Sequence, residues 1–190
     1  MTGADLGPCV VLITGVMAAG KSTVAQLLAE SLPRAVHVRG DLFRRMIVSG
    51  RAEMTPDEAA EARSQLDLRQ RLSAQVADVY ADDGWTAVVQ DIVLGADLPR
   101  YVDRVRTRPL HVVVLAPSPG TVREREEARG KTGYGAWTVE AFDAHLRSGT
   151  PRIGLWLDTS GQTPEETVSA ILDGLGGGGD EGGAAPQAAS

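Results

Sequence analysis

Cysteine is nearly absent from this sequence, and a long apolar run is missing altogether. Cys9 is the only cysteine, which excludes an internal disulfide and fits a reducing compartment. No apolar stretch is long enough to cross a bilayer, and no signal-like segment opens the chain. Histidine is scarce too, and His145 has no partner at metal-ligand spacing. We therefore expect a cytoplasmic protein that does not enter the membrane.

Positive charge is in the minority as well. The 19 lysines and arginines face 25 aspartates and glutamates, which gives a net charge of -6. This balance provides no global positive field for nucleic acid or an anionic membrane and leaves room only for a local basic site. The 190 residues, 43% of them hydrophobic, suffice for one domain with a full core. We expect a monomer or a homodimer, and we do not expect a nucleic-acid partner.

Strand-like segments alternate with helix-like segments along the chain. Apolar runs rich in β-branched residues predict strands at residues 9–14, 35–38, 86–91, 110–116 and 152–158. Helical spacing and helix-start signals predict helices at 21–32, 41–49, 55–83 and about 98–105, and further helices that begin near 118, 138 and 163. Strands separated by helices imply an α/β domain in which a parallel sheet is covered on both faces.

Two of these helices carry further signals. Residues 55–58 (TPDE) and 163–166 (TPEE) both have the form of a capping box, in which Thr and Glu satisfy each other's backbone amides. The long helix that follows the first of them should bury one face against the core. That face is expected to consist of Leu68, Leu72, Val76, Val79 and Tyr80.

The boundaries of the domain follow from the same patterns. Residues 9–175 should form the domain, with a lid segment at about 126–137 and an N-terminal extension at 1–8. The segment 176–190 is rich in glycine and has almost nothing to bury, so we expect it to be disordered.

The loop after the first strand carries the most specific motif. Residues 15–23 read GVMAAGKST and fit the phosphate-loop pattern GxxxxGK[ST]. Glycines let backbone N–H groups approach phosphate oxygens, and the helix that begins at Lys21 points its positive end at them. Lys21 would reach the β- and γ-phosphates, and Ser22 would bind Mg²⁺. The loop is expected to hold ATP or GTP through Gly15, Val16, Met17, Ala18, Ala19, Gly20, Lys21, Ser22 and Thr23.

Aspartates lie near the ends of two other buried strands. Because ligands bind beyond the carboxyl ends of parallel strands, Asp41 and Asp91 should both face the γ-phosphate and the substrate. Asp91 is the candidate magnesium ligand. It is followed by Ile92 and not by a glutamate, which speaks against an energy-coupling ATPase. Asp41 would either accept the proton of an attacking hydroxyl or simply cap its helix, and Arg44 follows it as a candidate substrate-binding residue.

An arginine-rich segment follows the fourth strand. Residues 122–135 read VREREEARGKTGYG, and a lid in this place would bring arginine onto the transferring phosphate. The candidates are Arg125 and Arg129, although a charged helix end is often no more than a solvated face.

The order of these parts resembles the nucleoside-monophosphate-kinase-like group of P-loop kinases, and within it the chloramphenicol phosphotransferases most closely. The resemblance spans about residues 9–175, and it implies a strand order of 2-3-1-4-5. The matching segments are GVMAAGKST (15–23), the strand end at Asp41, VVQDIVLG (88–95), REEARG (125–130) and LDTS (157–160).

The resemblance also implies roles for single residues. Asp41 takes the position of the general base, and Arg125 and Arg129 belong to the lid. Asp158 and Thr159 lie where such kinases contact adenine. GDLFRR (40–45) is also similar to the acceptor-phosphate motif of adenylate kinases and to the DxxR motif of polynucleotide kinases.

These observations predict a kinase that uses Mg²⁺ and transfers the γ-phosphate of ATP, or of GTP, to a hydroxyl of a small molecule such as a metabolite or an antibiotic. One alternative is a kinase whose acceptor already carries phosphate, either a nucleotide or a 5′ nucleic-acid end. Arg44 would then bind that phosphate. The other is a nucleotide-dependent switch without catalysis.

Replacing Lys21 tests the phosphate loop. Lys21→Ala should leave the fold intact and abolish phosphoryl transfer, because the ammonium acts on the phosphates. Circular dichroism checks the fold, and ADP release measures the transfer. Equal turnover by the variant and the parent would contradict the assignment of the loop.

Overall fold

The middle of the sheet is its most apolar part. The computed structural model describes residues 4–53, 60–128 and 138–176. In it, β1 (Cys9–Gly15) is buried along its whole length, because a strand lies on either side and helices cover both faces. The first strand therefore forms the centre of the core.

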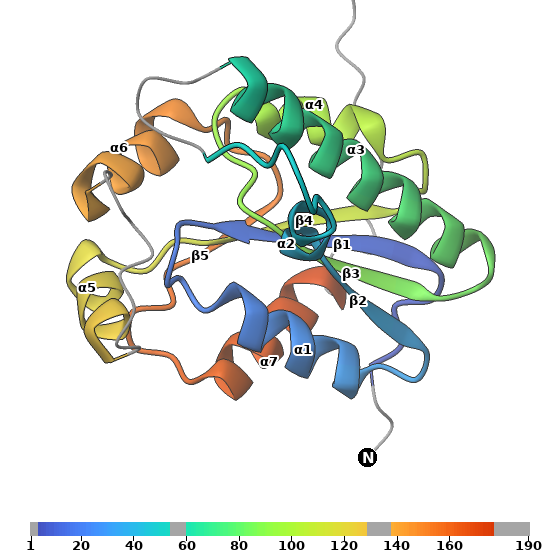
Figure 1. Cartoon of the computed structure of the whole chain (residues 1–190). Coiled ribbons are helices and arrows are strands. Elements are labelled where there is room, and N and C mark those ends of the chain that lie inside the picture. The colour runs from blue at the N-terminus through green and yellow to red at the C-terminus, as the bar shows by residue number, and fades with distance from the viewer. Residues whose placement is uncertain (1–3, 54–59, 129–137, 177–190) are drawn as a thin grey trace, which may run out of the picture.

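All five strands run in the same direction, and their order is β2-β3-β1-β4-β5 (Figure 1). β1 pairs with β3 and β4, while β2 and β5 form the two edges. The order predicted from the sequence is confirmed. The outer strands and their neighbours are β2 (Ala35–Arg39), β3 (Thr86–Gln90), β4 (Leu110–Leu115) and β5 (Leu155–Leu157).

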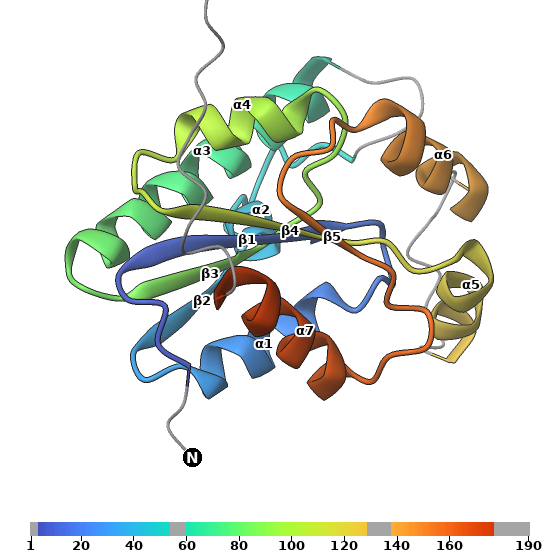
Figure 2. The ribbon, with the colours of Figure 1, turned by 180° about the vertical axis from the view of Figure 1, so that it is seen from behind.

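Helices lie on both faces of the sheet (Figure 1, Figure 2). α1 (Lys21–Ser31) and α7 (Pro164–Gly176) cover one face, and α3 (Ala60–Asp82) and α4 (Asp97–Arg104) cover the other. Within the described ranges, no helix has the length and the apolar character needed to cross a membrane.

Three further helices lie near the carboxyl ends of the strands. α2 (Gly40–Arg45) follows β2 directly and packs on α3. α5 (Pro119–Ala128) and α6 (Val139–Gly149) pack on each other (Figure 1, Figure 2). The end of the sheet where the strands finish is thus flanked by helices from three parts of the chain.

Two elements are shorter than the sequence predicts by more than a single residue. α2 ends at Arg45 and not near Ser49, and Met46 and Val48 beyond it are exposed, so no apolar packing extends the helix. β5 begins at Leu155 and not at Arg152. Gly154 has a φ of +74°, and a Cβ atom there would lie 2.2 Å from the carbonyl oxygen of Val112, so this glycine brings the chain close to β4 in a conformation that a strand does not have.

The start of α7 is as the sequence predicts. The backbone amide of Thr163 donates to the Glu166 carboxylate over 2.8 Å, and the amide of Glu166 donates to Thr163 Oγ1 over 3.2 Å. This is the reciprocal pair of a capping box. The similar segment 55–58 lies outside the described residues.

The buried face of α3 differs from the prediction. Leu68, Val79 and Tyr80 are exposed, whereas Leu72 and Val76 are half-buried and Val76 packs against the core, so the predicted face is buried only in part. The helix turns small and polar side chains inward instead, because these let its backbone lie close to the sheet and to α4. The fully buried positions are Ala62, Gln70, Ser73, Ala74, Ala77, Asp78 and Ala81.

Candidate active site

The loop between β1 and α1 has a shape that favours small residues. Gly15 and Gly20 have φ angles of +146° and +95°, and Ala18 has a φ of 59°. A side chain at Gly15 would also collide with β4, because a Cβ atom would lie 2.4 Å from the carbonyl oxygen of Leu115. The loop therefore curls tightly over the end of β1, as a phosphate-binding loop does.

Lys21 begins α1 and is almost fully buried. Its Nζ atom donates a hydrogen bond of 2.6 Å to the carbonyl oxygen of Val16. The positive charge is thus held inside the loop at the N-terminal end of α1, where the helix dipole also favours an anion. The two effects together suit the β- and γ-phosphates of a nucleotide.

Ser22 contacts the end of β3. Its hydroxyl donates to Oε1 of Gln90 over 3.2 Å, and Gln90 is the last residue of that strand. A hydroxyl has one hydrogen and two lone pairs, so this bond leaves the lone pairs for a metal ion. Gln90 is not among the site residues predicted from the sequence, whereas its neighbour Asp91 is.

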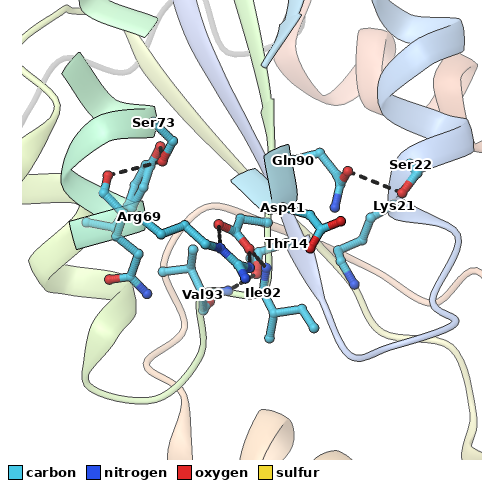
Figure 3. Close-up of polar contacts among 12 residues, drawn as sticks. Thr14, Lys21, Ser22, Asp41, Arg69, Ser73, Gln90, Ile92 and Val93 are labelled. Carbon is cyan, nitrogen blue, oxygen red and sulfur yellow. Dashed lines mark hydrogen bonds and ion pairs between the residues drawn. The ribbon is translucent and has the colours of Figure 1, made fainter. Parts of the chain in front are cut away.

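Asp41 lies in the first turn of α2, beside the phosphate loop. Figure 3 shows its carboxylate pointing toward Lys21 and Gln90, on the same side as Ser22. Its Oδ2 atom forms an ion pair of 2.6 Å with Arg45, and 43% of the side chain is exposed. An acceptor molecule can therefore reach this carboxylate.

The N-cap position of α2 is occupied by Arg39 and not by Asp41. The alternative interpretation of Asp41 as a helix cap is therefore wrong. The carboxylate lies one full residue inside the helix, where it is oriented toward the site and not toward the amides of its own first turn.

Asp91 follows β3 directly, but its carboxylate contacts α3. Arg69 Nε donates a bond of 2.7 Å to Oδ2, and Arg69 Nη2 pairs with Oδ1. The backbone amide of Ile92 also donates to Oδ1, over 2.6 Å. In Figure 3, Arg69 lies on the opposite side of Asp41 from Ser22. The metal role of Asp91 stays a prediction, and Gln90 is the strand-end residue that contacts Ser22.

Arg69 is a second residue that the sequence patterns do not single out. Burial lowers the pKa of Arg69; the Asp41 carboxylate opposes this shift, and Arg44 adds to it. The buried guanidinium is therefore close enough to α2 to be affected by two of its side chains. Arginine is mostly an exposed residue, so its position in a long helix gives no sign of this role.

A cavity of about 370 Å³ lies beside the phosphate loop, among α1, α5 and the segment that leads into α7. Its volume is within the range of small-molecule sites. Among the residues that line it are Ala19, Gly20, Thr23, Arg125, Thr159 and Gln162. Because it adjoins the phosphate loop, it is the candidate site for the base of the nucleotide.

Thr159 gives this cavity an unsatisfied polar group. The side chain is buried, and Oγ1 has no hydrogen-bond partner among the described residues. A buried hydroxyl without a partner is costly, so the wall of the cavity carries an unsatisfied polar group at this residue. Asp158 contributes less directly: its carboxylate accepts bonds from the amide and the hydroxyl of Ser160, which lower the pKa of Asp158. It shapes the turn that presents Thr159.

Arg125 joins two walls of the cavity. Its Nη2 atom donates to the carbonyl oxygen of Thr159 over 2.8 Å, and Nη1 donates to that of Ala19 over 3.4 Å. The structure thus brings Arg125 to the phosphate loop, and its action on the transferring phosphate stays a prediction. Arg129 and most of the lid at 126–137 lie outside the described residues.

A family of known sequences matches most of this chain. The family model for an AAA domain (AAA_33) matches residues 10–151, which include the phosphate loop, Asp41 and Gln90. The chain belongs to this family.

Similar proteins include a UPF0200 protein from Aeropyrum pernix, which is 30% identical over 133 residues, 68% of this chain and 70% of that protein. The structure of Mycobacterium tuberculosis APS kinase in complex with AMPPNP and APS has a TM-score of 0.67 and 20% identity, covering 88% of this chain and 96% of that one. The Deinococcus radiodurans tunicamycin resistance protein has a TM-score of 0.68 and 20% identity, with coverage of 88% and 95%. These likenesses confirm the P-loop kinase fold of the AAA domain.

The described part of the AAA domain holds no group of three or more histidine, cysteine, aspartate or glutamate side chains that could hold a metal ion. A metal at Ser22 would therefore depend on the phosphates of the nucleotide for most of its ligands. Mg²⁺ commonly binds in this way, through one or two protein groups, water and phosphate oxygens. The donor set around Ser22 fits a nucleotide-bound Mg²⁺.

Removing Arg125 tests the assignment of the cavity. Arg125→Ala should weaken binding of an ATP analogue by about tenfold, which corresponds to about 1.4 kcal/mol, because the two walls lose their link. Isothermal titration calorimetry measures the change. The matched control is Arg123→Ala on the same helix, where the exposed guanidinium pairs with Glu140. Equal affinity in both variants would show that the nucleotide does not occupy this cavity.

Proposed function

We propose that this chain is a kinase that transfers the γ-phosphate of ATP to a hydroxyl group of a small molecule, with Mg²⁺. The observation that carries this proposal is the position of the Asp41 carboxylate, which points toward Lys21 across the phosphate loop (Figure 3). A base beside a phosphate-binding loop is what direct phosphoryl transfer to an alcohol requires. The fold of the P-loop kinases supports the same reaction class.

The residues of the loop would bind and orient the nucleotide. Backbone amides and Lys21 hold the β- and γ-phosphates and stabilise the charge on the moving group. Ser22 offers its lone pairs to Mg²⁺, since its hydrogen is donated to Gln90. The metal ion, when bound, supplies neutralisation of the phosphate charge. Arg125, and Arg129 by resemblance, would add positive charge from α5 and the lid.

Asp41 would hold the acceptor hydroxyl and take its proton. The side chain is nearly half exposed, so an acceptor can approach it, and the ion pair with Arg45 engages Oδ2 from the same helix. Transfer of the proton to a carboxylate makes the acceptor oxygen a better nucleophile as its bond to phosphorus forms. The position of Asp41 relative to Lys21 would set the direction of attack.

ATP is the proposed donor, and GTP is the alternative. The APS kinase of similar fold was solved with AMPPNP, an adenine nucleotide. In this chain Thr159 and Gln162 line the cavity and would lie next to the base. Both groups can donate or accept hydrogen bonds, so they fit a purine edge.

An uncharged alcohol is the proposed acceptor, either a metabolite or an antibiotic as the resemblance to the chloramphenicol phosphotransferases implies. Three arginines on this side of the site already have acidic partners, which favours an acceptor without charge. The pairs are Arg44 with Glu53, Arg45 with Asp41, and Arg69 with Asp91. A screen of metabolites and antibiotics for ADP release would identify the acceptor and would also exclude a non-catalytic switch.

One observation favours an acceptor that already carries phosphate. Arg44 lies three residues after Asp41 on α2, and its guanidinium pairs with Glu53 over 2.5 Å. Glu53 is 71% exposed, so this is a surface ion pair of low strength. An acceptor phosphate could replace Glu53 without a large cost. The chain would then act on a nucleotide or on a 5′ nucleic-acid end.

Replacing the two strand-end carboxylates separates their roles. Asp41→Asn should lower kcat by about 10²–10⁴-fold with little change in ATP affinity, because it removes the base and keeps its size. Asp91→Asn should raise the Mg²⁺ requirement if Asp91 holds the metal, and should leave it unchanged if the carboxylate serves Arg69. Turnover measured against Mg²⁺ concentration distinguishes the two. A parental rate in Asp41→Asn would remove Asp41 as the base.

Salt dependence and a double variant test the charge of the acceptor. For an uncharged alcohol, added salt should change the acceptor KM little, since screening acts on charge attraction over about 10 Å at 0.1 M. Replacing Arg44 and Arg45 together should then affect the KM values for acceptor and ATP similarly. Arg106→Ala, which breaks an exposed pair with Asp82 elsewhere, is the control. A large rise in the acceptor KM alone, in salt or in the double variant, would favour the phosphorylated acceptor.

A further inference from the structure

The buried ion pair between Arg69 and Asp91 has no task in the transfer described above. Its side chains are 15% and 1% exposed. Burying two charges is costly, and only close contact with additional hydrogen bonds offsets this cost. The Ile92 amide supplies such a bond to Asp91. A pair of apolar residues would fill the same space at a lower cost in free energy. The ion pair therefore calls for another explanation, and its effect on the position of neighbouring residues offers one.

Gly40 shows which part of the structure packs against the ion pair. It is the first residue of α2, and a Cβ atom there would lie 2.0 Å from Oδ2 of Asp91 and 2.4 Å from its Cγ. Gly40 is not among the glycines with positive φ, so it is needed for space and not for an unusual backbone angle. The backbone of the first turn of α2 therefore lies directly against the Asp91 carboxylate.

Asp41 is the next residue, so its direction depends on where this turn lies. Its ion pair with Arg45 joins two residues of the same helix and moves with that helix. α2 has only 6 residues, and a helix of this length needs tertiary contacts to hold its position. Those contacts come from α3, on which α2 packs, and from Asp91, which Arg69 of α3 fixes from the other side.

We propose that Arg69 and Asp91 are positioning residues, which form a fixed support for the first turn of α2 and thereby hold Asp41 across from Lys21. This inference rests on the proposed function, in which Asp41 takes the acceptor proton. Under this proposal, neither Arg69 nor Asp91 contacts the nucleotide or the acceptor. Asp91 acts through Gly40, and Arg69 acts through Asp91.

A double-mutant cycle tests the inference in the 190-residue chain. The probe is MgATP alone, with hydrolysis by water as the readout and a fluorescent ATP analogue for binding. Arg69→Ala should lower turnover by up to about 10²-fold, because small misplacements of a catalytic group cost that much, and nucleotide affinity should stay within twofold. In an Asp41→Asn background, Arg69→Ala should cause little further loss, since both changes act on the same group.

Two results of this cycle would overturn the inference. Fully additive losses would show that Arg69 acts independently of Asp41. A large fall in nucleotide affinity, or a raised Mg²⁺ requirement, would place the pair in the binding of MgATP. Arg69→Lys serves as a rescue variant: it keeps the charge but lacks the fork that contacts both oxygens of Asp91, so it should restore turnover only in part.

Gly40→Ala provides a second variant that keeps both members of the ion pair. The added methyl group would collide with the Asp91 carboxylate and shift α2, so turnover should fall while nucleotide affinity is retained. Gly176→Ala is the matched control, because a Cβ atom there meets open space. Arg106→Ala is the control for losing an arginine in an ion pair that involves α3, because its partner Asp82 is the last residue of that helix. Parental turnover in Gly40→Ala would contradict the inference.

Hydrogen exchange keeps the inference separate from the proposed function. In Arg69→Ala, backbone amides of residues 40–45 should exchange faster than in the parent, whereas those of residues 21–31 should not change. If the parent neither hydrolyses ATP nor transfers phosphate, the proposed function fails, and this measurement still decides the positioning role. Unchanged exchange in 40–45 would overturn it.

Discussion

Parallel strands place all their carboxyl ends at one edge of a sheet, and the site depends on this constraint. β1 leads into the phosphate loop, β2 into Asp41, and β3 into Gln90 and Asp91. β5 leads into the turn that carries Thr159. These segments are far apart in the sequence, yet each needs only a few residues beyond its strand to reach the same place. The continuous burial of β1 fixes the sheet, and the sheet fixes the spacing between the groups.

The close packing of α3 against the sheet also determines where side chains of the site lie. Its buried alanines let the helix lie near the sheet, and the same closeness lets Arg69 reach the end of β3. The interface with α4 is polar as well, since Ser73 Oγ lies 3.1 Å from the Tyr101 hydroxyl. Directional polar contacts define position more sharply than apolar packing alone. They occur here on the side of the sheet where the acceptor would bind.

Local patterns in the sequence were enough for the phosphate loop, the strand order by resemblance, and the capping box at Thr163. The phosphate loop and the capping box depend on residues that are neighbours in the chain, whereas the strand order came from the resemblance. The inner face of α3 was predicted only in part, because Val76 packs against the core but the positions closest to the sheet are small residues that let the helix approach it. Gln90 and Asp91 show a related limit. Successive side chains along a strand and just beyond it point to opposite sides, so Gln90 contacts Ser22 on α1 and Asp91 contacts Arg69 on α3. Which of them faces the nucleotide depends on the phase of that alternation at the strand end.

The cavity near Thr159 and the carboxylate of Asp41 lie on two different sides of the phosphate loop. The cavity is formed with α1, α5 and the segment before α7, whereas Asp41 belongs to α2 on the side of α3. In the proposed reaction the donor and the acceptor would therefore enter by separate routes and meet only at the γ-phosphate. Such a layout suits a ternary complex in which either substrate binds first, and it requires no phosphorylated form of the enzyme between two half-reactions.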